Sequence, residues 1–226
     1  MDNALVLAFL EELRQNNSLD WMHANKARYQ QAKEGFEDFL QQLIFRIARF
    51  DASVAQLQPR ELVFRLNRDT RFAKDKSPYN PAFRAHISPG GRTPFPAGYY
   101  LCIKPGASFL GGGVFATQFP EATRLVRDHI AAHPEGLEAI LHSEAFREHF
   151  EVSGEKLKNV PAGYDKAHPL AEYLKHKSWD IEVPLSDGQF LAPDVLEHCA
   201  ETFRMMKPLN DYLNEAVGDF ELPKRP

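Results

Sequence analysis

The stretch from residue 65 to residue 79, RLNRDTRFAKDKSPY, concentrates positive charge in a chain that is acidic overall. Five arginines and lysines stand against two aspartates here, so this basic stretch has a formal charge of +3; the whole chain has −4, which leaves −7 for the remainder. Arginine presents a planar fork of N–H donors that matches the oxygens of a carboxylate or a phosphate. The pattern therefore predicts either an anion site or a dense network of internal ion pairs.

Our first hypothesis is a binding site, with or without turnover, for a small anionic, phosphate-bearing ligand. Arg65, Arg68 and Arg71 would bind the anion, and Asp69 would orient one guanidinium group. The candidate ligand-binding residues of the basic stretch are Arg65, Arg68, Asp69, Arg71, Lys76 and Tyr79.

A second basic segment follows at residues 155–178, where five lysines stand against three acidic residues. In the same hypothesis, Lys158, His168 and Lys177 of this second basic loop close over the bound anion. This step requires that the two basic segments meet in space, which spacing along the chain does not establish.

Two alternatives stay open. In the first, the protein is a nucleic-acid-binding module, because Phe72, Tyr79, Tyr164 and Trp179 lie among the basic residues and can stack on bases. The acidic remainder of the chain counts against it. In the second, the aspartates of the basic stretch pair with its arginines to hold a loop together, and the protein acts through partners.

The sequence marks no nucleophile, metal site or bound cofactor, so it identifies no reaction. Gly111-Gly112-Gly113 lacks the GxxxxGK[ST] pattern of a phosphate-binding loop, and a hairpin bulge or a close backbone approach explains it better. His129 and His133 are four residues apart on a predicted helix, but no HExxH motif is present and Pro134 ends that helix. We therefore predict no metal and no cofactor.

At 226 residues the chain can hold one large domain or two small ones, and 43% apolar side chains are enough to bury a sizeable core. Because the sequence shows no internal repeat and no linker, we predict one domain over residues 1–226. Cys102 and Cys199 are isolated, which is typical of a reducing cytoplasm. The N-terminus lacks the basic region of a signal peptide, and no apolar run approaches the roughly 18–20 residues of a membrane span. We expect a cytoplasmic protein without membrane contact, and nothing in the sequence sets its oligomeric state.

Apolar periodicity predicts helices at both ends of the chain and strands between them. Helical spacing covers residues 6–16, 18–26, 27–50, 120–133, 137–141, 144–150 and 193–217, with a break or kink at Pro208. Alternation with a period of two covers residues 62–67, 83–87, 98–104, 108–115 and 179–185, and Pro184 places the last strand at an edge or near its own end. The sequence therefore predicts an α+β fold, in which a mainly antiparallel sheet is flanked by N-terminal and C-terminal helices.

The basic stretch also carries a long pattern, RxxRDxRFxxDKxxY, from Arg65 to Tyr79. This pattern resembles the signature of a bacterial conserved-hypothetical family, domain of unknown function 2461. Further resembling blocks are Asn16-Asn17, Trp21, Asn25-Lys26, Tyr29, Gly98-Tyr99-Tyr100, Gly111 to Gly113, Leu157-Lys158, Pro161, Gly163-Tyr164, His168-Pro169 and Lys177-Ser178. Ala73 and Met22 depart from the usual pattern. The resemblance implies a shared fold and a shared site, but no reaction, because the family has no established activity.

Overall fold

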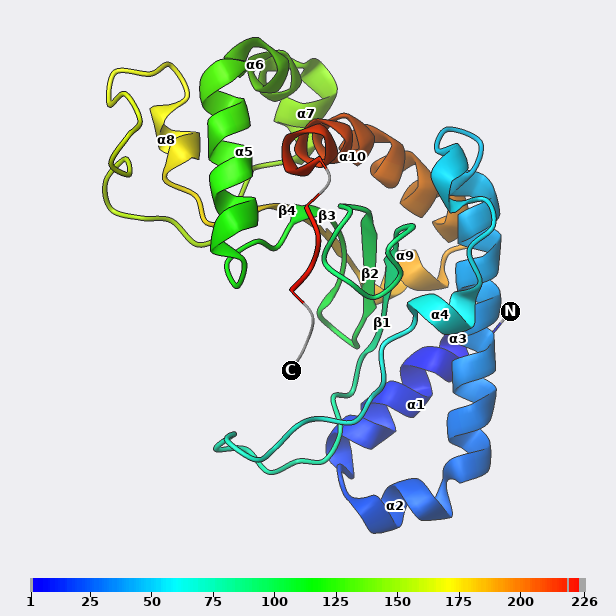
Figure 1. The fold of residues 1–226 in the computed structure, drawn as a ribbon. Helices are drawn as coiled ribbons and strands as arrows, with labels where there is room; N and C mark the ends of the chain where they lie inside the picture. Colours follow the sequence, from blue (N-terminus) through cyan, green and yellow to red (C-terminus); the bar gives the residue numbers. More distant parts are fainter. Residues whose placement is uncertain (1, 219, 224–226) are drawn as a thin grey trace.

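The computed structural model describes residues 2–218 and 220–223, and the statements below concern these residues. Helices surround one four-stranded antiparallel sheet, so the predicted α+β fold is confirmed (Figure 1). The N-terminal helices are α1 (Asn3–Gln15), α2 (Leu19–Ala24) and α3 (Lys26–Ile47), followed by the 3-10 helix η1 (Ala52–Val54) and the short α4 (Pro59–Leu62). The later helices are α5 (Pro120–Ala132), α6 (Pro134–His142), α7 (Glu144–His149), α8 (Ala171–Leu174), α9 (Asp187–Leu191) and α10 (Val195–Val217).

The sheet has the order β1-β2-β3-β4, and every neighbouring pair is antiparallel. Its strands are β1 (Phe83–Ile87), β2 (Tyr99–Ile103), β3 (Ser108–Val114) and β4 (Trp179–Leu185). Four of the five predicted strands are therefore confirmed, because their alternating residues fit a half-buried sheet. Pro184 lies in the edge strand β4, as predicted, where its missing N–H costs no ladder hydrogen bond.

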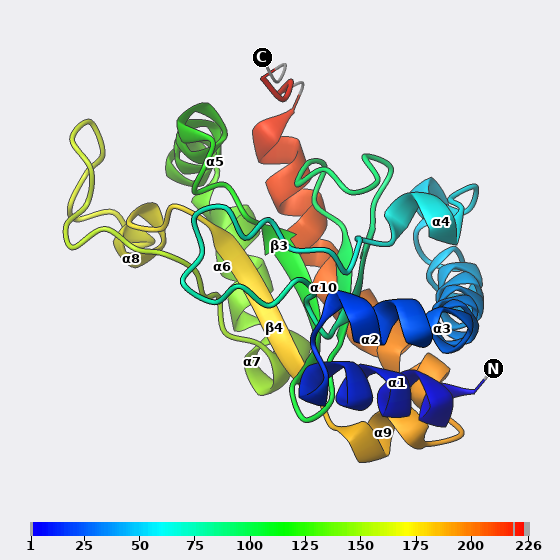
Figure 2. The same cartoon turned by 90° about the horizontal axis from the view of Figure 1, so that it is seen from below.

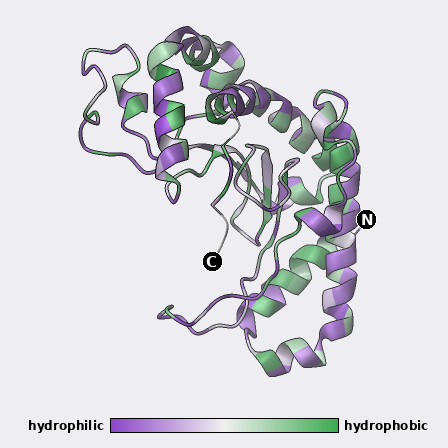
Figure 3. Cartoon of the chain, in the orientation of Figure 1, coloured by the Kyte–Doolittle hydropathy of each residue, from purple (hydrophilic) through white to green (hydrophobic). Residues whose placement is uncertain are grey.

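One face of the sheet packs against helices. Ala85, Leu101 and Leu110 are paired across three strands and are fully buried on this face. The long helix α10 packs mainly on β3, and α3 and α4 pack against β1. Most helices show a hydrophobic and a hydrophilic side in Figure 3, as expected for helices that bury one face against a sheet.

The other face of the sheet is only partly covered, and we call it the open face. Arg84, Tyr100 and Phe109 lie there, each half-buried, and Glu182 is exposed. The basic stretch leaves the body as a long two-armed loop, whose arms nearly overlap in Figure 1 and are seen apart in Figure 2. The sheet thus buries one face in the core and leaves the other partly open.

The predicted strand over residues 62–67 is wrong. Pro59 starts α4, which ends at Leu62, and the chain then makes only isolated bridges at Val63–Ala85 and Asn67–Tyr79. A continuous ladder to β1 is broken because the returning segment contains Pro78 and Pro81, which have no N–H to donate.

The sequence predicts a break or a kink at Pro208; the break is wrong, because α10 is continuous from Val195 to Val217. Pro208 removes one backbone hydrogen bond, but Met206, Leu209 and Leu213 on the same helix are buried in the core. Packing of this face outweighs the local preference of proline. The short α4, α8 and α9 were not predicted; α9 is set by a capping box between Ser186 and Gln189.

Two asparagines of α10 bind the backbone of the sheet. Asn210 is 3% exposed; its Oδ1 accepts a hydrogen bond from Gly113 N at 2.7 Å, and its Nδ2 donates to Gly98 O at 2.9 Å. One turn later, Asn214 Oδ1 accepts from Ala97 N at 2.7 Å, and Nδ2 donates to Ala97 O at 3.1 Å. These four bonds fix where the segment before β2 and the end of β3 lie.

We predict that Asn210→Ala destabilises the protein by about 2–4 kcal/mol, because it leaves one buried N–H and one buried C=O without a partner. Urea unfolding measures this loss. Asn159→Ala is the control, since Asn159 is exposed in the second basic loop. Equal stability of the two variants would contradict the role of the Asn210 amide.

Gly113 occupies a backbone conformation that only glycine adopts readily. Its φ is +91°, and an added Cβ would lie 2.0 Å from Trp179 O. A Cβ at Gly111 would meet nothing closer than 3.4 Å. We therefore predict that Gly113→Ala prevents stable folding or lowers the melting temperature strongly, whereas Gly111→Ala has a small effect. Thermal unfolding of the pair followed by circular dichroism tests this, and a similar loss at both positions would contradict it.

Candidate functional site

The basic stretch forms local ion pairs at two of its three arginines. Arg71 Nη2 lies 2.6 Å from Asp69 Oδ2, with the Arg71 side chain 78% exposed, and Arg68 pairs with Asp75. Hydrogen bonds from Arg71 lower the pKa of the Asp69 carboxyl; those from Ser77 and Arg68 lower the pKa of Asp75. Asp69 thus orients an arginine as predicted, but Arg68 and Arg71 do not converge on a common point with Arg65.

Lys76 and Tyr79 have structural contacts. Lys76 Nζ donates to Thr70 O at 2.9 Å, which closes the end of the loop. The side chain of Tyr79 belongs to the hydrophobic core, and its backbone N–H and C=O bind the Asn17 amide at 3.1 and 2.9 Å. Tyr79 therefore anchors the loop to the α1–α2 junction, and its ring does not line a ligand site.

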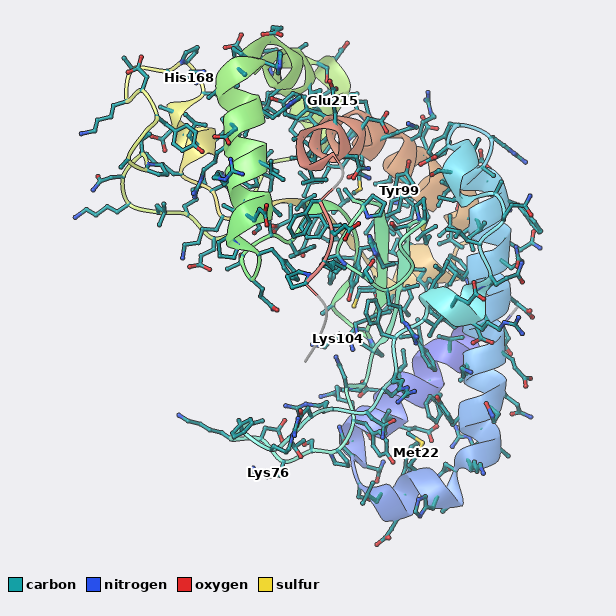
Figure 4. The ribbon with its side chains drawn as sticks, viewed as in Figure 1. Met22, Lys76, Tyr99, Lys104, His168 and Glu215 are labelled. Atoms are coloured by element: carbon teal, nitrogen blue, oxygen red, sulfur yellow. The ribbon has the colours of Figure 1, made fainter. Side chains whose placement is uncertain are left out.

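The second basic loop lies apart from the first. His168 Nδ1 accepts a hydrogen bond from Leu170 N at 3.0 Å, Lys177 pairs with Glu155, and Lys158 is exposed. Figure 4 shows His168 at the upper left of the view and Lys76 at the lower left, well separated from each other. Within the described ranges, no hydrogen bond or ion pair joins the two basic segments, so the structure does not bring the predicted residues together.

Arg65 instead joins two arginines from other parts of the chain. A pocket of about 190 Å³ is lined by Tyr29, Lys33, Glu37, Arg60, Val63, Phe64, Arg65, Phe83 and Arg92. Its one carboxylate, Glu37, already pairs with Lys33 at 3.3 Å. In the part of the chain that the structure describes, Arg60, Arg65 and Arg92 have no carboxylate within 4.0 Å. We call this the arginine pocket.

An adjoining pocket of about 160 Å³ has aromatic walls. It is lined by Phe64, His86, Arg92, Thr93, Pro94, Gly98, Tyr100, Gly112, Gly113 and Phe115. We call this the aromatic pocket; it shares Phe64 and Arg92 with the arginine pocket. Arg92 also donates to Val63 O at 3.4 Å, which holds its side chain near the boundary between the two.

Aromatic rings continue from this pocket across the open face. The ring centroid of Phe64 lies 6.0 Å from that of Tyr100, and Tyr100 stacks on Phe109 at 5.8 Å with an interplanar angle of 23°. The Arg84 guanidinium lies over Phe64 at 5.5 Å. Burial raises the pKa of Tyr100, so its hydroxyl remains protonated at neutral pH and can donate a hydrogen bond. Such a row can hold flat ligands by stacking.

His86 adds a hydrogen-bond acceptor to the aromatic pocket. Its Nδ1 lies 2.9 Å from Gly91 O, and since a carbonyl only accepts, Nδ1 carries the proton. Burial lowers the pKa of His86, so the ring is neutral at pH 7 and Nε2 keeps a lone pair. Nε2 lies close to Gly98, where an added Cβ would approach to 3.1 Å. This nitrogen can accept a hydrogen bond or a proton from a bound molecule.

The aromatic pocket is supported from behind by a cluster of three phenylalanines. Phe95 lies on the loop that carries Arg92, and its ring centroid is 5.0 Å from Phe220 and 5.5 Å from Phe119. The segment after α10 therefore packs against the loop that forms one wall of the pocket.

A family model described as a conserved hypothetical protein (DUF2461) matches residues 5–212. The chain belongs to the DUF2461 family. The resemblance predicted from the basic stretch is therefore confirmed at the level of the family. Searches of curated proteins and of solved structures found no match to this DUF2461 chain.

The sequence predicted Arg65 but missed Arg60, Arg92, His86 and Tyr100 of the candidate site. These residues come from α4, the loop after β1, β1 and β2, so only the tertiary fold brings them together. The one available signal was the family block Gly98-Tyr99-Tyr100. Among the described residues, no group of three or more His, Cys, Asp or Glu side chains is placed to hold a metal, and no helix is both long and apolar enough to cross a membrane.

We predict that the free energy of unfolding falls as the pH is lowered from 7 to 5. Burial lowers the pKa of His86 and His176 below the ordinary value of 6.5, so the unfolded chain binds more protons than the native protein in this range. Each unit of pKa difference is worth up to about 1.4 kcal/mol. Urea unfolding at several pH values measures the slope, which His86→Gln should reduce.

His142→Gln replaces an exposed histidine and serves as the control. A flat or rising stability between pH 7 and pH 5 would contradict the assignment of His86 and His176 as buried neutral groups.

Proposed function

We propose that the protein binds a small anionic, phosphate-bearing ligand across the arginine and aromatic pockets. The anionic group occupies the arginine pocket, and a flat apolar part lies in the aromatic pocket. One observation carries the proposal: Arg60, Arg65 and Arg92 meet at one concave site without a free carboxylate, beside a pocket with aromatic walls.

Electrostatics supports this arrangement. Three like charges around one pocket repel one another, and an anion placed between them removes that cost while accepting charge-assisted hydrogen bonds. The guanidinium fork matches phosphate better than it matches a single acceptor atom. Arg65 keeps the role that we expected of it, whereas Arg68 and Arg71 have local carboxylate partners and support the loop.

The shared residues Phe64 and Arg92 set the shape of the proposed ligand. Because they line both pockets, a molecule that fills both must carry its charge next to its flat part. His86 Nε2 supplies an acceptor for an N–H or O–H group on that flat part. His86 can also take up a proton, but a base alone defines no reaction, so the proposal is one of binding.

A nucleic-acid-binding module is the second candidate, and the row of Phe64, Tyr100 and Phe109 on an antiparallel sheet favours it. Aromatic rings on such a surface stack with bases. Glu182 on the same face and the overall charge of −4 oppose it. We also keep the proposal of a cytoplasmic location, since Cys102 and Cys199 are free, buried thiols that suit a reducing compartment.

We predict that one class of ligand raises the melting temperature of the wild type but not of Arg65→Ala or Arg92→Ala. Inorganic phosphate, nucleotides and sugar phosphates are the probes. A ligand at about 100 times its dissociation constant stabilises the protein by roughly 2.7 kcal/mol, a shift that thermal unfolding detects readily. Each arginine removed should weaken binding by about tenfold or more, because a charge-assisted hydrogen bond is lost.

Arg71→Ala is the matched control, since it removes an exposed arginine of the same stretch outside the pocket. It should respond to the ligand like the wild type. If instead Arg71→Ala loses the response and Arg65→Ala and Arg92→Ala keep it, the arginine pocket is not the binding site. No shift with any probe at millimolar concentration would also contradict the proposal.

A further inference from the structure

The basic stretch exposes a phenylalanine almost completely. Phe72 is 95% exposed, whereas the other exposed large apolar residues are about half covered: Leu19 55%, Phe45 55%, Phe115 49% and Leu191 51%. Phe72 lies four residues before Lys76, which Figure 4 labels on the projecting loop. Covering this ring with a partner would be favourable, although a single exposed apolar residue does not by itself mark an interaction surface. The charge next to Phe72 in the sequence is the second observation.

The basic stretch that carries Phe72 also holds positively charged side chains without a carboxylate partner. The opposite charges cancel within each of the ion pairs Arg71–Asp69 and Arg68–Asp75. The formal charge of +3 on the basic stretch therefore belongs to Arg65, Lys74 and Lys76. Lys76 binds the carbonyls of Thr70 and Arg71, which are neutral and leave its charge uncompensated. The loop is therefore held together by its own contacts and still attracts an anion.

The same segment runs from the joined pockets to Phe72. Phe64 lies in both pockets, Arg65 lines the arginine pocket, and Phe72 follows seven residues later. Seven residues span at most about 25 Å, a distance that several nucleotides of a single strand cover. A partner that occupies the pockets and continues along the loop would need negative charge and flat rings at repeated intervals.

We propose that the phosphate-bearing ligand of the joined pockets is one nucleotide of a single-stranded nucleic acid, and that Phe72 stacks on a base of the same strand. Lys74 and Lys76 bind the phosphates between them. This inference rests on the proposed function. The remainder of the chain repels a polyanion, which limits the contact to the joined pockets and the basic stretch.

The rings on the open face favour nucleic acid over an anionic membrane as the partner. Phe64, Tyr100 and Phe109 form a row of neighbouring rings beside and on the sheet, in which Tyr100 stacks on Phe109 and Phe64 is tilted by 50° to Tyr100. Lipid headgroups offer no flat group for these rings. Bases offer a π-face whatever the sequence, so we expect binding with little sequence preference.

Fluorescence anisotropy with labelled twelve-nucleotide oligo-dT and oligo-U tests the inference, with calorimetry of the mononucleotides alongside. Wild type should bind the oligonucleotides at least about tenfold more tightly than the mononucleotides. Phe72→Ala should weaken oligonucleotide binding by about tenfold to a hundredfold and leave mononucleotide binding unchanged. Lys74→Ala combined with Lys76→Ala should reduce the dependence of binding on salt.

Phe45→Ala is the control, because it removes an exposed phenylalanine from α3, away from the basic stretch. Arg65→Ala should weaken both oligonucleotide and mononucleotide binding. Phe72 is exposed, so its removal should leave the melting temperature near that of the wild type, which excludes misfolding as the cause.

The outcomes separate this inference from the proposed function. If mononucleotides bind through Arg65 and Arg92 but oligonucleotides bind no better, or if Phe72→Ala changes nothing, the single-strand inference is wrong and the small-ligand site stands. If neither binds, the single-strand inference is wrong, and the small-ligand site is then decided by inorganic phosphate and the sugar phosphates. If wild type binds vesicles of phosphatidylserine and phosphatidylcholine through Phe72 and no oligonucleotide, the inference is overturned in favour of a membrane surface.

Discussion

The amide of Asn210 is the constraint on which the site depends. It joins the longest helix to Gly113 and Gly98, two residues that line the aromatic pocket. The net contribution of each hydrogen bond of a buried amide to the free energy of unfolding is small. Any arrangement that breaks these bonds is nevertheless strongly unfavourable, because it leaves unsatisfied polar groups in the core. The position of Gly98 and Gly113 in the pocket wall is therefore set from the far side of the sheet, by a residue that does not line this pocket.

Charge is divided between two uses within one short segment. Arg71 forms an ion pair with Asp69, two residues away, and Arg68 forms one with Asp75, seven residues away. These contacts shape the loop. Arg65 lies at the base of the loop, where the nearby carboxylate of Glu37 is already bound to Lys33. An arginine in this segment therefore either stabilises the loop or remains available to an anion. The difference is whether a free carboxylate lies close enough to pair with it.

Much of the fold could be predicted from periodicity. The faces of α1, α3 and α10 and the alternation in β1 to β4 follow from local spacing, and the local pairing of Asp69 and Asp75 with arginines was one of the open alternatives. The prediction for residues 62–67 was wrong, although their apolar and polar residues alternate as in a strand. The helix α4 and the prolines of the returning segment prevent a continuous ladder there. The arginine pocket could not be predicted, since Arg60, Arg65 and Arg92 converge only through the path of the chain after β1.

The position of Pro184 has a consequence for how the protein behaves while it folds. An open sheet edge is a template on which other chains can add strands, and the resulting aggregates are hard to reverse. Here Pro184 interrupts the row of N–H donors on β4, and Ser153 bridges to Asp180 farther along the same edge. At the opposite edge, Val63 bridges to Ala85 of β1. Because both edges of the sheet are covered or interrupted, other chains cannot readily add strands to it. The protein can therefore leave one face of its sheet partly open to solvent.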